Sequence, residues 1–136
     1  MATQTTTYDD IYQLFKTNCN AEGLMMPRTT EQQYDVIKNA VMLYNNRLRD
    51  DLKCDDEFEV ISRILNDDEQ LIIAHFMRLT LLKNMRTYKN SIFTTFTQEI
   101  GVRNVNAQLN SLKDEIEQEE NTIDMLIFNM INETIM

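Results

Sequence analysis

The side chains best suited to chemistry form an acidic stretch near the middle of the chain. Carboxylates at this density could coordinate calcium, but an EF-hand loop also needs a glycine at its sixth position and a bidentate glutamate at its end. Neither stands at that spacing here. We therefore interpret the stretch as a solvated acidic loop. Its members are Asp50, Asp51, Asp55, Asp56, Glu57 and Glu59.

His75 is the only histidine and lies among apolar residues in a predicted helix. A catalytic base needs a nucleophile and an orienting group beside it, and the neighbouring residues supply neither. Cys19 or Cys54 would have to reach it through the fold, and no feature of the sequence indicates that they do. The cysteines show no metal-ligand spacing, which favours free thiols in a reducing compartment, with a single disulfide as the alternative. We expect a structural or interfacial histidine.

A run of glutamates near the C-terminus, Glu115, Glu117, Glu119 and Glu120, is typical of a solvated helix face. A di-iron bundle needs Glu-x-x-His motifs from two helices, and one histidine cannot supply them. The chain also has no phosphate-binding loop, dinucleotide fingerprint or G-x-S-x-G elbow. We therefore expect no enzymatic activity, no metal site and no cofactor.

Composition favours a single helical domain over residues 1–136. Two glycines and one proline are too few for the turns of an all-β or doubly wound α/β domain. The formal net charge of −9 argues against sequence-independent binding to nucleic acid and against attachment to anionic lipid. The start of the chain has neither a basic nor an apolar run, so no export signal is predicted. The expected fold is all-α, a small antiparallel bundle of about four helices with a long C-terminal helix.

The segment from Asn66 to Tyr88 is the predicted centre of this bundle. It is apolar on almost every helical face, so other elements must enclose it. It is too short, and too interrupted by His75 and two basic residues, to cross a membrane. Asn66, with Glu69 three residues later, predicts a reciprocal N-terminal cap.

Polar composition and capping residues predict the structure of the N-terminal segment. Residues 1–6 are expected to be a flexible polar lead. Thr6 with Asp9, or Thr7 with Asp10, predicts the start of a first helix of about ten residues.

A second helix is predicted from the capping box of Thr30 and Gln33, and it should fade near residues 49–53. The apolar connector 24–27 before it is expected to press on the core. Residues 54–65 also fit a helical turn, but we expect an extended or irregular connection there.

Residues 89–104 are predicted to be a connector. Their β-branched and aromatic side chains disfavour a helix, and Gly101 marks a turn. The apolar side chains of this connector either cover their own bundle or dock on a neighbouring subunit. The inter-subunit candidates are Phe93 and Phe96.

The stretch from Val105 to the end of the chain is predicted to be the longest helix, of about thirty residues. Apolar residues recur at near-heptad spacing along it, and their register is interrupted at Glu119 and Glu120. Its last part, residues 125–136, is more apolar than one bundle face requires. We interpret the excess as a contact surface for another chain. The expected contact residues are Met125, Leu126, Phe128, Met130, Ile131, Ile135 and Met136.

The order of these segments resembles that of one family. The chain opens with YDDIYQLF, continues with AVMLYNNRLRDDL and an acidic connector, and closes with LNDDEQLIIAHFMRLTLL and LNSLKDEIEQEENTIDMLI. Over nearly its whole length this pattern of apolar spacings is similar to the small helical head–tail connector proteins of tailed phages, also called neck or adaptor proteins. The most telling positions are Leu65, Glu69, Ile72, Ile73, Ala74, Met77 and Leu82.

The resemblance implies a structural virion protein without enzymatic activity or cofactor. Such proteins form a ring, usually dodecameric, that docks under the portal and extends the DNA channel towards the tail. The implied partners are further copies of the chain, the portal protein and a tail-side neck or stopper protein, with no membrane. Genomic DNA would pass without specific binding. The implied location is the neck of the virion, after assembly in the host cytoplasm, with the apolar tail reaching the portal.

The negative charge suits such a channel, because a weakly repulsive surface lets DNA pass without sticking. The acidic residues between Asp50 and Glu59 are therefore candidates to face the lumen. The alternative function is a soluble acidic helical regulator that binds and inhibits a host enzyme or a nucleic-acid-binding protein. A regulator would need an organised acidic face, and it would seldom leave an apolar tail bare.

Overall fold

The computed structural model describes residues 5–19, 24–100 and 102–135, except for the side chains of residues 94–100, 102–103 and 133–135. Its elements are α1 (Tyr8–Asn18), α2 (Thr30–Leu48), β1 (Cys54–Asp55), β2 (Val60–Ile61), α3 (Asp67–Ile100) and α4 (Val102–Ile135). The predicted all-α bundle is confirmed.

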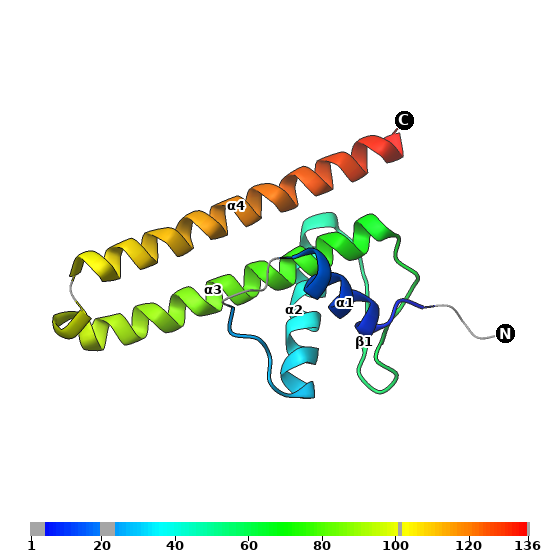
Figure 1. Cartoon of the computed structure of the whole chain (residues 1–136). Helices are drawn as coiled ribbons and strands as arrows, with labels where there is room; N and C mark the ends of the chain where they lie inside the picture. Colours follow the sequence, from blue (N-terminus) through cyan, green and yellow to red (C-terminus); the bar gives the residue numbers. More distant parts are fainter. Residues whose placement is uncertain (1–4, 20–23, 101, 136) are drawn as a thin grey trace.

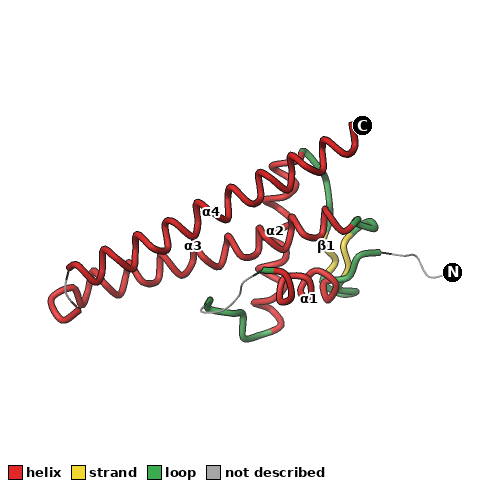
Figure 2. Tube along the Cα trace, turned by 45° about the horizontal axis from the view of Figure 1, so that its top comes forward, coloured by secondary structure: helices red, strands yellow, loops and turns green. Residues whose placement is uncertain are grey.

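The helices are arranged around α3. Figure 1 shows α3 and α4 side by side as a long antiparallel hairpin, with α1 and α2 packed against the N-terminal half of α3. Figure 2 shows the same pairing from a second direction, with the two short strands close to α1. The far half of the α3–α4 hairpin extends beyond the other elements.

The N-terminal half of α3 is enclosed on several sides, as predicted. Five of its residues have no exposed surface, and they point to different sides of the helix because their spacing does not follow one stripe. α1, α2 and α4 each contact α3 and together cover these sides. The five residues, each 0% exposed, are Ile72, Ile73, Ala74, Met77 and Leu82.

Two predicted caps are present, and a third is displaced by one residue. Thr7 and Asp10 form a capping box on α1. The backbone N–H of Asn66 donates to Glu69 Oε1 at 3.1 Å, and the N–H of Glu69 donates to Asn66 Oδ1 at 2.8 Å. At α2 the cap is Thr29, so the predicted box starting at the next residue is wrong in position.

The expected connector 89–104 is wrong, because α3 continues to Ile100 and α4 begins at Val102. Helix propensity is a weak preference, and packing against α4 outweighs the β-branched and aromatic residues of this stretch. Phe93 is only 7% exposed, so it covers its own hairpin and is not available to a neighbouring subunit. The side chain of Phe96 lies outside the described residues.

The connection 54–65 is extended, as expected, and forms an antiparallel hairpin in which Cys54 pairs with Ile61. The expected flexible lead ends too late, because Thr6 is 3% exposed. Its backbone carbonyl accepts a hydrogen bond from Ile61 N–H at 2.7 Å, and its hydroxyl accepts one from Leu65 N–H at 2.7 Å. Thr6 is thus fixed against the hairpin, and residues 1–4 of the expected lead lie outside the described residues.

Candidate functional site

The candidate contact surface lies on the C-terminal part of α4. Among the side chains that the structure describes there, three large apolar ones are exposed: Met125 is 57%, Phe128 63% and Ile131 45% exposed. We call these three residues the outer stripe. They belong to the set that the sequence assigns to a partner chain.

The rest of that predicted set does not share this exposure. Leu126 and Met130 are partly buried and pack against the hydrophobic core of their own chain. The side chains of Ile135 and Met136 lie outside the described residues. Only part of the predicted tail is therefore open to a partner.

Helix geometry explains this division. At about 100° per residue, the outer stripe lies between about 80° and 200° around the axis from Ile123. Ile123 is 1% exposed and Ile127 is 7% exposed, and both lie on the face that packs against α3. The end of α4 thus has two apolar faces, and its own chain covers one of them.

Part of the acidic stretch helps to build the β1–β2 hairpin. Asp55 Oδ1 accepts hydrogen bonds from the N–H groups of Glu57 at 3.0 Å and Phe58 at 3.3 Å, which closes the turn. Glu59 has a positive φ of 56°, and its carbonyl accepts a hydrogen bond from Tyr8 N–H at 2.8 Å. These contacts give local structural roles to part of the predicted channel-facing set.

Two more carboxylates of the stretch are paired with cations of their own chain. Asp56 accepts hydrogen bonds from Lys38 Nζ at 2.8 Å and from Tyr8 Oη at 2.7 Å. The Lys38 bond and the Tyr8 bond hold the pKa of Asp56 below its usual value. Asp50 forms an ion pair with Arg63.

A buried polar cluster, which the sequence did not predict, joins α3 to α4. Glu119 is 3% exposed, so its assignment to a solvated face is wrong. Its Oε1 lies 2.5 Å from His75 Nδ1, and its Oε2 accepts a hydrogen bond from Arg78 at 2.5 Å. We call these three residues the polar cluster. The break in the apolar register of α4 could have indicated this cluster, because Glu119 lies on the face of α4 that packs against α3.

The thiols are poorly suited to nucleophilic chemistry. Burial raises the pKa of Cys19 to about 12; the Glu119 carboxylate also raises it, and Arg78 lowers it. Burial likewise raises the pKa of Cys54. A thiol that keeps its proton at neutral pH is a weak nucleophile, so Cys19 fits a packing role beside the polar cluster. Both cysteines are free thiols.

Among the residues that the structure describes, no group of three or more histidine, cysteine, aspartate or glutamate side chains could hold a metal ion. No helix in the described part of the chain is long and apolar enough to cross a membrane.

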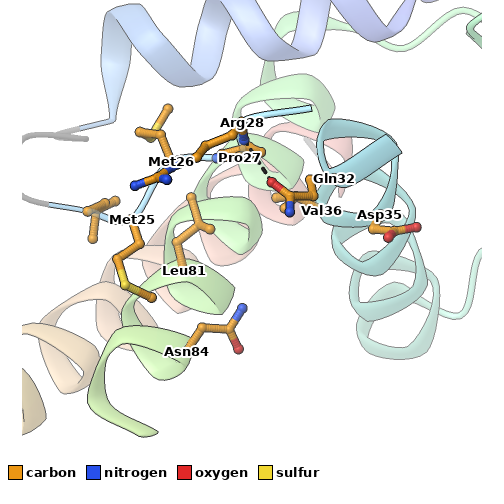
Figure 3. Close-up of a pocket in the computed structure, with 10 residues that line it drawn as sticks. Met25, Met26, Pro27, Arg28, Gln32, Asp35, Val36, Leu81 and Asn84 are labelled. Atoms are coloured by element: carbon orange, nitrogen blue, oxygen red, sulfur yellow. Dashed lines mark hydrogen bonds between the residues drawn. The ribbon is translucent and has the colours of Figure 1, made fainter. Parts of the chain in front are cut away.

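An open groove of about 850 Å³ lies between the segment 24–28, the start of α2 and the middle of α3. Figure 3 shows Met25 and Leu81 among its lining side chains. The backbone N–H of Arg28 donates to Gln32 Oε1 at 2.8 Å, which ties the segment to α2. The predicted packing of the apolar connector on the core is confirmed for Leu24 and Met26, whereas Met25 is 46% exposed and lines the groove.

These features define an all-α, acidic protein in which described side chains of α4 form an exposed apolar face, and the comparisons place it among prophage proteins. The chain belongs to the YomZ prophage protein family, which it matches over residues 4–132. It is 40% identical over 124 residues, covering 91% of this chain and 95% of the relative, to the SPbeta prophage-derived uncharacterized protein YomZ of Bacillus subtilis strain 168. No solved structure matches the chain significantly.

Proposed function

We propose that this protein is a structural subunit of the phage particle, in a head–tail connector ring that docks on the portal and extends the DNA channel towards the tail. The observation that carries the proposal is the outer stripe of α4. Apolar side chains that are 45–63% exposed on successive turns of one helix are typical of a surface that another chain covers. Membership of a prophage family agrees with the phage origin that this proposal requires.

The acidic regulator receives less support from the hairpin. Such a protein would present an organised acidic face to its target. Asp56 and Asp50 are instead paired with Lys38 and Arg63 of their own chain, which reduces the negative potential there. An exposed apolar stripe also favours assembly over a free regulator.

The ion pairs of Asp50 and Asp56 reduce the number of carboxylates that we propose to face the DNA channel. Asp51 and Glu57 are exposed, and neither forms an ion pair among the described residues. We assign the weak repulsion of passing DNA to these two carboxylates. Changing both to lysine should slow genome ejection, whereas Glu115→Lys on α4 should not. Unchanged ejection by the double variant would remove the channel assignment.

The structural role is tested in particles. Phage particles purified after induction should contain the protein in a fixed ratio to the portal protein, measured by quantitative mass spectrometry. Deletion of its gene should leave DNA-filled heads without tails in electron micrographs. Complementation with Phe128→Glu should fail, and complementation with Phe58→Glu should succeed, since Phe58 is 69% exposed but lies at the hairpin turn. Infectious particles of normal appearance from the deletion strain would refute the proposal.

A further inference from the structure

We infer that the outer stripe of one copy docks in the groove of a second copy, so that subunits associate head to tail. The inference deepens the proposed function, because it names the surfaces through which subunits would join. The stripe consists of Met125, Phe128 and Ile131 on α4, and the groove lies between segment 24–28, α2 and α3.

The two surfaces fit one another in chemistry and size. A helix that binds a groove presents apolar anchors on successive turns, and the stripe residues recur at every third position. The groove offers Met25, Val36 and Leu81 as apolar contacts, and its volume of about 850 Å³ lies in the range of sites that enclose several large side chains. Figure 3 shows these three side chains around the groove.

Charge complementarity favours a second copy as the occupant. Beyond Lys113, α4 contains acidic residues but no lysine or arginine. Arg28 lines the groove, and Lys89 lines a neighbouring pocket that shares Leu24 with the groove and also contains Glu115. Neither cation forms an ion pair among the described residues, so both are available to carboxylates flanking an incoming α4. Asp35 also lines the groove and leaves its rim polar, as is usual around an apolar contact.

The stripe cannot fill the groove of its own chain. Glu119 lies opposite His75 and Arg78, and α3 and α4 are antiparallel, so Phe128 lies at the level of the first residues of α3. The groove borders α3 at Leu81, which is about 20 Å further along the helix at about 1.5 Å per residue. Complementary surfaces at different places on one chain produce a head-to-tail contact, which closes into a ring or continues as a filament.

The test uses the full chain and two disabling variants. Phe128→Glu removes the central anchor of the stripe, and Met25→Glu places a carboxylate in the groove. Sedimentation over a range of concentrations should show association of the unchanged chain. Each variant alone should weaken it by about thirtyfold or more, as loss of a central anchor does. Arg28→Glu should weaken it as well and provides a second groove variant. Phe58→Glu, a matched change of an exposed aromatic residue, should leave association unchanged, and circular dichroism should show equal helix content in all chains.

Mixing the two variants gives the decisive result. A Phe128→Glu copy keeps an intact groove, and a Met25→Glu copy keeps an intact stripe. An equimolar mixture should therefore form a heterodimer and no larger species. A mixture that remains monomeric, or a wild-type chain that remains monomeric at every concentration, would overturn the head-to-tail contact and leave the portal or another protein to cover the stripe. The proposed function would survive that outcome if purified particles still contain the protein.

Discussion

Removing the Glu119 carboxylate should cost this protein a large part of its stability. Glu119 is 3% exposed, and its oxygens lie 2.5 Å from both His75 and Arg78. The side chains of these two partners are only 13% and 14% exposed, so Glu119→Ala leaves them with little access to water. Breaking a buried ion pair by removing one partner costs about 3–5 kcal/mol. The long Arg78 side chain can move towards solvent, which places our expectation at about 3 kcal/mol.

Thermal and urea unfolding, followed by far-ultraviolet circular dichroism, measure this cost. For a chain of this size, about 3 kcal/mol corresponds to a fall in Tm of about 10 °C. Glu117→Ala is the matched control, because it changes an exposed glutamate on the same helix and should alter stability by less than about 0.5 kcal/mol. A loss below about 1 kcal/mol for Glu119→Ala would contradict the reasoning, because exposed ion pairs contribute no more than that.

Replacing all three residues of the polar cluster together tests whether the cluster stabilises the fold or specifies the alignment of α4 with α3. Leucine at all three positions of the polar cluster continues the apolar register of α4 and leaves no buried charge. Such a replacement is often neutral or stabilising, by about 1–4 kcal/mol. If the triple variant is instead less stable than the wild type, the cluster contributes net stability. If it is stable but its helices associate in more than one register, the cluster specifies how α4 aligns with α3.

Three further predictions concern protonation. The folded state lowers the pKa of Asp56 below its ordinary value of 3.8. This carboxylate therefore stabilises the fold fully above pH 3.8 and loses its contribution as pH falls through the folded pKa. The difference in stability between the wild type and Asp56→Asn should shrink in acid titrations below pH 3.8. Burial raises the pKa of Tyr44 above 10.0, so its contribution is complete below that pH and is lost as pH rises. Tyr44→Phe should therefore resist alkaline unfolding better than wild type, although loss of the bond to Glu69 costs about 1 kcal/mol at neutral pH. In a Cys54→Ser background, Cys19 should react with a disulfide reagent on the order of a thousandfold more slowly in the folded than in the unfolded protein. The reason is that burial raises the pKa of Cys19 from 9.0 to about 12. Equal rates in the two states would contradict the burial of this thiol.

The sequence was sufficient to predict structural features that depend on residues close together along the chain. Asn66 and Glu69 are three residues apart because a reciprocal cap needs that spacing, and Thr7 with Asp10 forms the same arrangement. The few glycines and prolines favoured helices, and the absence of a single apolar stripe on α3 indicated enclosure. These features depend on neighbours along the chain, so the sequence contained them in full.

The tertiary structure decided the features that depend on distant partners. Residues 89–100 are helical because α4 packs beside them, although their intrinsic propensity favours other conformations. Glu119 is buried because His75 and Arg78, more than forty positions earlier, compensate its charge. Thr6 is ordered because a hairpin far along the chain supplies its hydrogen-bond partners. The groove also requires three separate segments to meet. Apolar periodicity and caps specify single helices. Whether a charge can be buried, or a segment of low helix propensity can be helical, depends on the residues that pack against it in the folded protein.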